Sequence, residues 1–396
     1  MNQVSNARRN LALYPWYVGA VSFFAWMPVF FLFFLSKVAF DEVLLLGSVY
    51  YLGVVFFEVP SGYFSDRFGR RRTLVYAASS LALAYAVFVL ASTFWQFVIA
   101  QLLLALGLAL NSGTDTSFHL ANLKALDLVK EYSSREARIS SVTFASTALA
   151  ALCGGGLASV ELVYPYVLSG AAGCLALAVT LAFKPVLETD EPSSMNIKES
   201  VRLSLAETRN APLGWLFFAF VVATIVNHIP YEFYQAYLSE LEPSHFADGM
   251  TPLMAGVHMA LVMLVAVPFA RLSGSLAERL GLKKVILVSI AAQLLLVGLM
   301  AFLENWLVVF FLLLRSVPRA LQDAPLRAAV APRLSSEIRV TYLSLQSLAG
   351  RLGFAALLAV FSLPYFEGLA QVLEAALFCG IVLLAILATR ASKVSV

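Results

Sequence analysis

The sequence predicts an all-α integral membrane protein with twelve transmembrane helices, arranged as two pseudo-symmetric six-helix bundles. The 396 residues are 60% hydrophobic and 13% charged, whereas soluble domains are nearer half apolar and a quarter charged. Apolar runs of about 20 residues, the length that crosses a bilayer as a helix, recur along the chain. One polar loop motif occurs twice, 212 residues apart, which indicates two matching halves.

Twelve spans are expected from the lengths of the apolar runs. The first six are placed near residues 13–35, 43–62, 73–92, 95–119, 139–159 and 165–183. The second six are placed near residues 212–237, 252–270, 284–303, 306–328, 340–361 and 370–389. The first apolar run, Leu11–Ser36, is too long for the core of a signal peptide and is expected to remain as a span.

A long polar stretch between the sixth and seventh spans divides the chain into three parts. An N-terminal six-helix bundle is expected over residues 1–184, a cytoplasmic linker over 185–211 and a C-terminal six-helix bundle over 212–396. Within the linker, Ile197, Val201 and Leu205 fall on one face of an amphipathic segment. This pattern predicts a short helix that lies on the membrane surface.

Lysines and arginines fall almost entirely on one side of the predicted spans. The opposite side carries only Lys37, among acids such as Asp41, Glu240 and Glu304. The positive-inside rule therefore predicts that both termini are cytoplasmic. The net charge of +3 is small and gives no support for a nucleic-acid partner. The three cysteines have no metal-ligand spacing, and no cofactor is expected.

The repeated motif lies in corresponding loops of the two halves. The loop after the second span reads GYFSDRFGRRR, from Gly62 to Arg72, and the loop after the eighth reads GSLAERLGLKK, from Gly274 to Lys284. Glycine, acid, arginine, glycine and paired basic residues recur at the same spacing. Two matching halves of six spans are typical of secondary transporters built from parallel repeats.

The first loop resembles the loop motif of the major facilitator superfamily, Gly-x-x-x-Asp-Arg-x-Gly-Arg-Arg/Lys-Arg/Lys, in full. With the span count, the linker and the orientation, the resemblance covers essentially the whole chain. It implies the major facilitator fold and transport of a small solute by alternating access. The stretches FEVPSG, NSGTDTSF and SLQSLAGRLGF resemble a bacterial drug-exporter-like branch, and so imply the bacterial inner membrane. The resemblance also implies a gating role for Gly62, Asp66, Arg67, Gly69, Arg70, Gly274, Glu278, Arg279 and Gly281.

The residue types of the first loop suit a gate. Gly62 allows close approach of a neighbouring helix, and Asp66 can face the positive end of a helix dipole. Arg67 and Arg70 can pair with cytoplasmic acids, so that the loop would latch the halves in the outward-open state. The alternative is that the arginines only enforce the topology.

Two positions depart from the family's patterns. Many members carry an arginine in the fourth span, four residues before a glycine, and with Gly107 as that glycine the position holds Leu103. A proton relay built on that arginine is therefore absent or relocated. The fifth span contains Gly154, Gly155 and Gly156 without the proline of the exporters' Gly-Pro motif. This run suggests close helix packing but weakens a drug/proton antiport assignment.

The tenth span carries an ionisable residue at every fourth position, so that one face of the helix bears Arg315, Arg319, Asp323 and Arg327. The eleventh span adds Arg351 at comparable depth. Charges inside a membrane are costly and usually face a cavity or a partner, and arginine forks bind anionic groups. The alternative is internal pairing, of Arg319 with Asp323 along the helix or of Arg315 and Arg351 with acids of other spans. The predicted substrate-binding residues are Arg315, Arg319, Arg351, Asn227 and Tyr231.

Carboxylates inside the spans are candidates for proton coupling, because an acid in a partly dry cavity can exchange protons at physiological pH. The first half offers Asp115 and Glu58, and the second half offers Glu232 and Asp323. We expect Asp115 or Glu58 to carry the coupling proton, with Glu232 next. The alternative is that these acids simply pair with arginines of the loops.

The function expected first is proton-coupled export of small amphiphilic compounds by a monomer in the lipid bilayer. An importer or facilitator of a nutrient or siderophore is the alternative, because the loop motif and the arginines serve either direction. A membrane receptor or enzyme is the alternative of another class. The sequence contains no GxSxG nucleophile motif, HExxH zinc site or P-loop, so no enzymatic activity is predicted.

Overall fold

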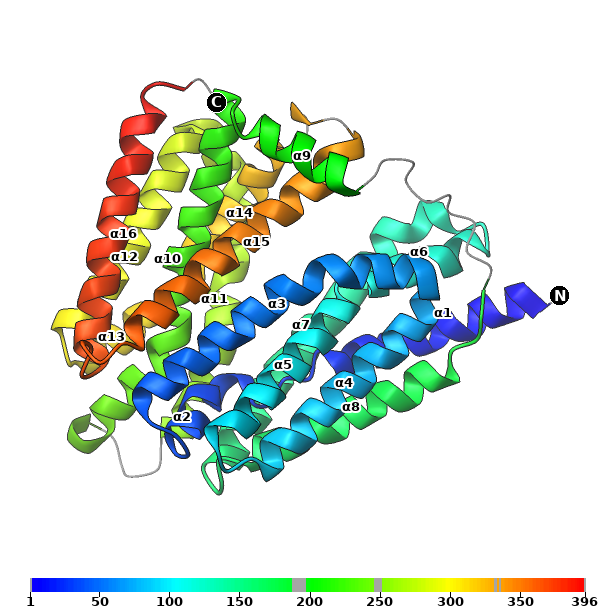
Figure 1. Ribbon diagram of the computed structural model, residues 1–396, viewed down its shortest axis with the longest axis horizontal. Coiled ribbons are helices and arrows are strands. Elements are labelled where there is room, and N and C mark those ends of the chain that lie inside the picture. The colour runs from blue at the N-terminus through cyan, green and yellow to red at the C-terminus, as the bar shows by residue number, and fades with distance from the viewer. Residues whose placement is uncertain (1, 187–196, 246–250, 331–332, 335, 395–396) are drawn as a thin grey trace. The chain divides into compact units, whose positions relative to one another are not determined.

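The computed structural model describes residues 2–186, 197–245, 251–330, 333–334 and 336–394 (Figure 1). Within its helices, the side chains of residues 2, 59, 62, 63, 66, 133, 134, 136, 137, 140, 197, 242–245, 336, 337, 339 and 340 lie outside the description. The described residues form helices and their connections, with no strand among them. The protein is therefore all-α.

The chain divides into two compact units. Unit 1 comprises Met1–Pro192 together with Pro252–Val257, and unit 2 comprises Ser193–Thr251 and His258–Val396. The break between Pro192 and Ser193 falls inside the linker expected over 185–211, which lies partly outside the described residues. The predicted domain bounds themselves stay a prediction.

Unit 1 contains the helices of the first half of the sequence, and α4 packs against both α5 and α8 (Figure 1). The helices are α1 (Asn2–Val21), η1 (Met27–Val29), α2 (Phe30–Leu35), α3 (Phe40–Phe68), α4 (Arg70–Leu90), α5 (Phe94–Asn111), α6 (Thr114–Lys124), η2 (Val129–Glu131), α7 (Tyr132–Ala158) and α8 (Tyr164–Ala182).

Unit 2 contains most of the second half, and α12 packs against α16 while α10 packs against α15. The helices are α9 (Ile197–Glu207), α10 (Ala211–His245), α11 (Thr251–Leu280), α12 (Leu282–Phe302), α13 (Trp306–Leu312), α14 (Val317–Val330), α15 (Ser336–Phe361) and α16 (Leu369–Ala391).

Ten segments within the described residues are long and apolar enough to cross a membrane. They match ten of the twelve predicted spans. The other two predicted spans, 13–35 and 306–328, are interrupted: the first consists of α1, η1 and α2, and the tenth consists of α13 and α14. The fourth predicted span, 95–119, is also broken, at Ser112 and Gly113 between α5 and α6. The twelve-span, all-α membrane fold is confirmed, and three of its predicted spans are broken helices.

The repeat of the sequence is reproduced in the backbone. Helices α4 and α12 begin after Gly69 and Gly281, which have φ values of 86° and 84°. Each glycine N–H donates a 3.0 Å hydrogen bond to a carbonyl four residues earlier, on Ser65 and Ala277. Glycine enters this region of backbone space without the steric penalty of a Cβ, so each glycine ends one helix and starts the next.

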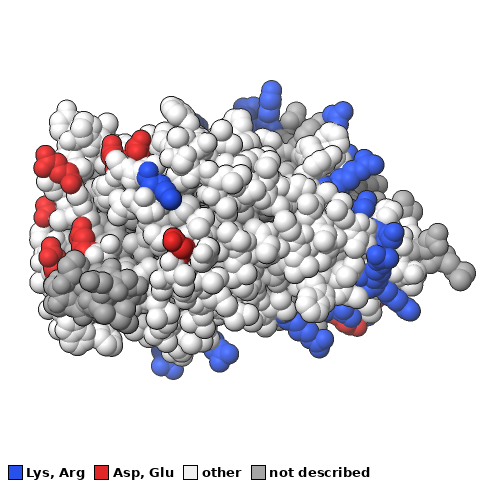
Figure 2. Space-filling model, turned by 90° about the horizontal axis from the view of Figure 1, so that it is seen from below, with Lys and Arg blue, Asp and Glu red and all other residues white. Residues whose placement is uncertain are grey.

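Charged side chains gather at the two ends of the helices. Figure 2 shows most of the lysines and arginines of the visible face at one end and most of the aspartates and glutamates at the other, with few charged side chains between them. Many large apolar side chains of the spans are exposed, such as Phe56, Leu264 and Phe378. Lipid is the solvent that accommodates such a surface.

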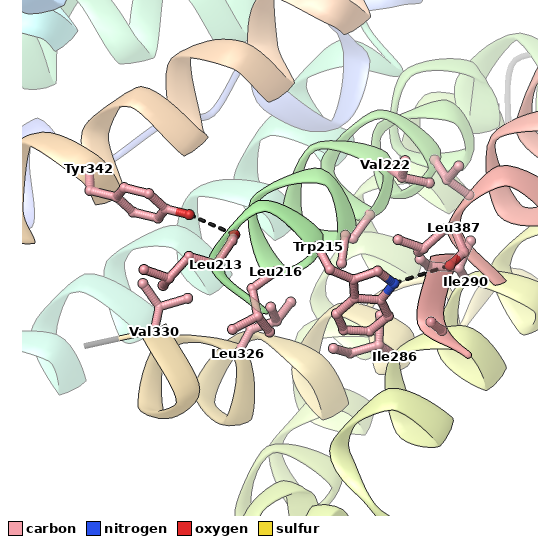
Figure 3. Packing of buried hydrophobic residues seen from close by; sticks show 14 of the residues in the cluster. Leu213, Trp215, Leu216, Val222, Ile286, Ile290, Leu326, Val330, Tyr342 and Leu387 are labelled. Atoms are coloured by element: carbon pink, nitrogen blue, oxygen red, sulfur yellow. Dashed lines mark hydrogen bonds between the residues drawn. The ribbon is translucent and has the colours of Figure 1, made fainter. Parts of the chain in front are cut away.

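The core of unit 2 holds an apolar cluster whose polar atoms are satisfied (Figure 3). The Trp215 indole N–H on α10 donates to the Leu387 carbonyl on α16 at 3.1 Å. The Tyr342 hydroxyl on α15 donates to the Leu213 carbonyl at 2.7 Å. These bonds fasten the first turns of α10 to two other helices, so α10 is a fixed support for the polar groups farther along it.

Unit 1 has an aromatic core instead. Phe33 on α2 lies 4.2 Å from the Tyr166 ring on α8 and 5.8 Å from the Phe97 ring on α5. The Trp26 indole N–H donates to the Tyr85 hydroxyl at 3.1 Å. Close packing in the fifth span, predicted from its glycine run, is observed at Gly154, which leaves no room for a Cβ beside the backbone of Ala25.

The predicted linker helix is present as α9, but it docks through a different face. Ser200 and Ser204 are buried against α15, where their hydroxyls contact the Thr341 hydroxyl at 2.9 Å and the Ile338 carbonyl at 3.4 Å. Leu205, on the predicted apolar face, is exposed. Two serines that find hydrogen-bond partners on α15 thus decide which side of α9 is buried.

Candidate functional site

The interrupted tenth span places a polar group in the middle of unit 2. Pro318 lacks an N–H, and its ring would clash with the carbonyl of residue 314 in a continuous helix. Helix α13 ends at Leu312, and the N–H groups of Leu313, Leu314 and Arg315 reach carbonyls three residues earlier, at 2.9–3.1 Å. This tightened 3₁₀-like turn separates α13 from α14, and stretches of this kind often mark hinges.

Arg315 stands in this break and is buried, with 4% of its surface exposed. Its Nη1 lies 2.6 Å from Nδ1 of His258 on α11. Its guanidinium carbon lies 4.0 Å from the centre of the Tyr234 ring on α10, in cation–π geometry. The Gln293 amide of α12 donates to the Arg315 carbonyl at 3.2 Å. Four segments of unit 2 therefore meet at this residue.

The partners of the Arg315 guanidinium are neutral groups. Within the described residues, no carboxylate forms an ion pair with Arg315. A buried cation without a counter-ion is costly, and its retention in a membrane span points to a function. The Nδ1 lone pair of His258 and the face of the Tyr234 ring stabilise the cation instead.

The partners of His258 fix its tautomer. An arginine guanidinium only donates, so Nδ1 of His258 accepts and carries no proton. The proton is then on Nε2, which donates to the Val309 carbonyl at 3.0 Å. His258 is buried and stacks beside Tyr234, with 5.8 Å between ring centres. In this structure the ring is neutral and both of its nitrogens are used.

A second polar group lies on α10, α14 and α15. The Arg319 Nε donates to the Asp323 carboxylate at 3.3 Å, and the Arg319 side chain is 65% exposed. Arg319 and Arg351 both lie near enough for their charges to act on the His228 ring. His228 donates through Nδ1 to the Thr224 carbonyl at 2.6 Å, because a carbonyl only accepts.

Arg319 lies near the middle of its span. Counting ~1.5 Å per residue from Trp306, it is roughly 20 Å along the span. An exposed guanidinium at this depth is far less costly beside water than beside hydrocarbon. The aromatic rings of Phe354 and Tyr231 lie 5.1 Å and 6.5 Å from His228. The second group therefore combines arginine guanidinium groups with aromatic side chains.

The predicted substrate residues fall into two sets. Arg319, Arg351 and Tyr231 belong to the second polar group, called the exposed group because Arg319 is exposed. Arg315 belongs to the buried group one turn away. Asn227 is half-exposed on α10 and, among the described residues, makes no polar contact with either group. The pairing of Arg319 with Asp323, which was the alternative to the substrate-binding role, is present, and it coexists with the exposure of Arg319.

The predicted proton-coupling acids lie in both units. Glu232 is buried on α10. Asp115 starts α6, where its Oδ1 accepts from the Thr116 N–H at 2.7 Å. Glu58 is half-buried on α3, and Asp323 is the acid paired with Arg319. Burial distinguishes Glu232 from the other three.

The gating residues keep to the ends of helices. Gly62 and Asp66 fall on α3, but their side-chain positions lie outside the described residues. Arg70 donates to the Ser117 carbonyl of α6 at 3.2 Å, and Arg67 is exposed. In the second copy, a Cβ on Gly274 would meet nothing within 4 Å, while Glu278 and Arg279 are exposed.

Sequence reasoning missed the partners of Arg315. The repeat held a signal, because Arg315 follows Leu103 by the same 212 residues that separate the two loop motifs. The arginine absent from the fourth span is thus found at the matching position of the tenth. Contact with His258 and Tyr234 depends on tertiary packing and leaves no local pattern. No group of three metal-ligating side chains occurs within the part of the chain that was described.

Comparison with known proteins identifies the fold family. The family model described as Major Facilitator Superfamily matches residues 15–356. The tetracycline resistance protein, class D, of Salmonella ordonez is 25% identical over 273 residues, which cover 68% of this chain and 66% of that protein. The match thus spans slightly less than two thirds of the curated relative.

Solved transporters share the fold at low sequence identity. The nucleoside transporter NupG has a TM-score of 0.78 at 14% identity, with 97% of this chain and 98% of that chain covered. An auto-inhibited POT family peptide transporter has a TM-score of 0.73 at 14% identity, with 100% and 98% covered. At these identities the likeness concerns the fold alone.

Proposed function

The chain belongs to the major facilitator superfamily, and we propose that it is a proton-coupled exporter of amphiphilic compounds whose polar end is an anionic oxygen group. It is a multi-pass membrane transporter and not an enzyme. The observation that carries the proposal is the exposed Arg319 in the middle of a span, beside Arg351 and His228.

The exposed group supplies the chemistry for a polar end. Guanidinium forks donate paired hydrogen bonds to carboxylates, sulfonates and similar groups. Asp323 holds Arg319 from one side only, which leaves other guanidinium donors for a ligand. The rings of Tyr231 and Phe354 offer apolar contact for the body of the compound. An amphiphile meets both requirements.

Export is supported by the curated relative. That protein is a tetracycline resistance protein, and resistance is the outcome that export of a compound would give. Import of a nutrient or siderophore is the alternative, and the direction of pumping decides between them. Proton coupling is proposed for Glu232 in unit 2 and for Asp115 or Glu58 in unit 1, with Asp323 as the acid within the exposed group.

We extend the proposal to the loops and the topology. Both termini are cytoplasmic in the bacterial inner membrane, consistent with the separation of charges in Figure 2. The two copies of the loop motif act as gates, and their glycines Gly69 and Gly281 give each gate the same sharp turn. The protein works as a monomer, because each bundle completes its own core.

Transport by the purified full-length protein in liposomes tests the proposal. The probes are tetracycline, an anionic anilinonaphthalene sulfonate dye and the cation ethidium, each under an imposed pH gradient. We expect the dye or tetracycline to move against protons. Movement of the probe with the protons would support the importer instead, and movement of ethidium alone would exclude an anion site.

Substitutions in the exposed group sharpen the test. Arg319→Gln and Arg351→Gln should each raise the KM for the anionic probe by roughly ten- to a hundredfold, the worth of one charged hydrogen bond. Arg327→Gln is the matched control, since Arg327 lies on the same helix, is exposed and touches neither polar group. An unchanged KM in both site variants would disprove the role of these arginines.

A further inference from the structure

The contact between Arg315 and His258 exists only while His258 is neutral. A protonated imidazole carries an N–H on both nitrogens. Nδ1–H would then point at an Arg315 N–H across 2.6 Å, donor against donor and cation against cation. Protonation of His258 and retention of Arg315 are therefore mutually exclusive in this geometry.

The surroundings of the pair leave His258 as the group that can switch. From α10, Tyr234 lies under the guanidinium, and Tyr231 is near enough to act on Arg315. Glu232 lies on the opposite side of the same helix from Tyr234, because two residues at 100° per residue make about 200°. α12 contributes the neutral Gln293 amide, and α13 contributes the Val309 carbonyl. Arginine does not give up its proton in proteins.

We propose that His258 is a protonation-controlled latch that holds Arg315 and, through it, the break between α13 and α14. The inference rests on the proton coupling proposed above and assigns it a residue that the sequence did not. With a neutral ring, the latch fixes the 3₁₀-like turn in its observed form. With a protonated ring, the guanidinium leaves and must find other acceptors.

Movement of Arg315 would be felt along the span. The residue is part of the turn itself, and its carbonyl is fastened to Gln293 of α12. Arg319, in the exposed group, follows one helical turn later. A change at the turn therefore reorients the helix that carries the substrate group. Protonation of His258 is thereby linked to a conformational step of the transport cycle. Alternating access requires an element with two conformations, and the turn between α13 and α14 is that element.

Nitrogen NMR of the full-length protein in lipid nanodiscs tests the latch without any substrate. The sample carries labelled histidine and arginine side chains, and the signals of His258 and Arg315 are assigned by their loss in His258→Asn and Arg315→Met. At alkaline pH we expect the neutral Nε2–H tautomer. On acidification the imidazolium and a new Arg315 signal should emerge together. A neutral ring protonated on Nδ1, or protonation that leaves the Arg315 signal unchanged, would overturn the proposal.

Transport of tetracycline in liposomes provides the second test. Asparagine can accept from Arg315 through its side-chain oxygen but does not titrate, so His258→Asn should keep the latch closed at every pH. We expect it to retain binding of tetracycline and to lose accumulation driven by a pH gradient, because the conformational step no longer responds to protons. His119→Asn is the matched control, because His119 is also buried, stacked 4.5 Å from Tyr14 in unit 1.

The outcomes separate the latch from the proposed function. Full gradient-driven accumulation in His258→Asn would refute the latch. If the wild-type protein accumulates none of the probes, the exporter proposal fails, and the NMR experiment alone decides the latch. Loss of both binding and accumulation, in a variant that remains folded, would mean that His258 serves binding or structure and would also refute the latch.

Discussion

Helix α5 matches residues 306–323 in the 212-residue repeat, yet α5 is continuous where the second copy is broken between α13 and α14. Both begin after a capped turn: Thr93 is capped by Gln96, and Asn305 accepts from the Leu307 N–H at 2.9 Å. Helix α5 then continues to Asn111, whereas α13 stops at Leu312. The halves differ where a proline and an arginine enter the second copy.

The contrast separates a packing role from a working role. In α5, Leu103 stands at the position matching Arg315, and Gly107 packs so closely on α4 that a Cβ would lie 2.7 Å from Leu81. In the second copy, the same positions hold the buried Arg315 and the exposed Arg319. The repeat conserves the scaffold of both units, and unit 2 departs from it to hold charge inside the membrane.

The largest effect is expected from Arg315→Met. Replacing a buried charge that lacks a counter-ion by an apolar side chain removes the cost of keeping that charge out of water. We therefore expect unchanged or higher thermal stability in detergent, together with loss of pH-gradient-driven transport. A large fall in the unfolding temperature would show instead that Arg315 serves the fold.

Gly107→Val should act in the opposite sense. The new side chain overlaps Leu81 in a tightly packed interface, so the free energy of unfolding should fall by about 1–3 kcal/mol. Thermal unfolding of the purified variant measures this. Wild-type stability would mean that α4 and α5 separate easily, and the proposed scaffold role of unit 1 would be lost.

The two loop glycines should respond alike. Gly69→Ala and Gly281→Ala each place a Cβ in a left-handed backbone region, at a cost of roughly 1–2 kcal/mol. A Cβ at either position would meet no neighbouring atom within 4 Å, so the conformation alone is tested. Unequal losses of thermal stability would break the equivalence of the two turns.

The smallest effect on stability is expected from Asp323→Asn. The pair with Arg319 is solvent-exposed, and such pairs contribute only about 0–1 kcal/mol. The unfolding temperature should barely change, while the KM of the anionic probe shifts because the orientation of Arg319 is lost. A strongly destabilised variant would show that the pair is structural.

The fold was largely predictable from the sequence because membrane spans are set by length and apolarity. The loop motif also located Gly69 and Gly281, whose positive φ follows from the lack of a Cβ. The interruption of the tenth span was signalled by Pro318, although apolar length alone predicted one continuous helix. A proline shortly after an arginine inside an apolar run is therefore the sequence pattern that predicts such an interruption.

Tertiary contacts could not be predicted in the same way. Leu205 belonged to the predicted apolar face of α9, but Ser200 and Ser204 dock because α15 presents partners for their hydroxyls. His258 pairs with Arg315 across 57 residues of sequence. Neither contact follows from the periodicity of one helix, and both depend on how the helices of unit 2 are arranged.

The most direct test of the account compares Arg315→Met with Leu103→Met in liposomes. Both place the same side chain at matching positions of the repeat, and both are measured as tetracycline accumulation under a pH gradient. We predict that Arg315→Met falls to the level of protein-free liposomes while Leu103→Met stays near wild type. Equal effects of the two substitutions, or normal accumulation in Arg315→Met, would contradict the claim that the broken span of unit 2 drives transport.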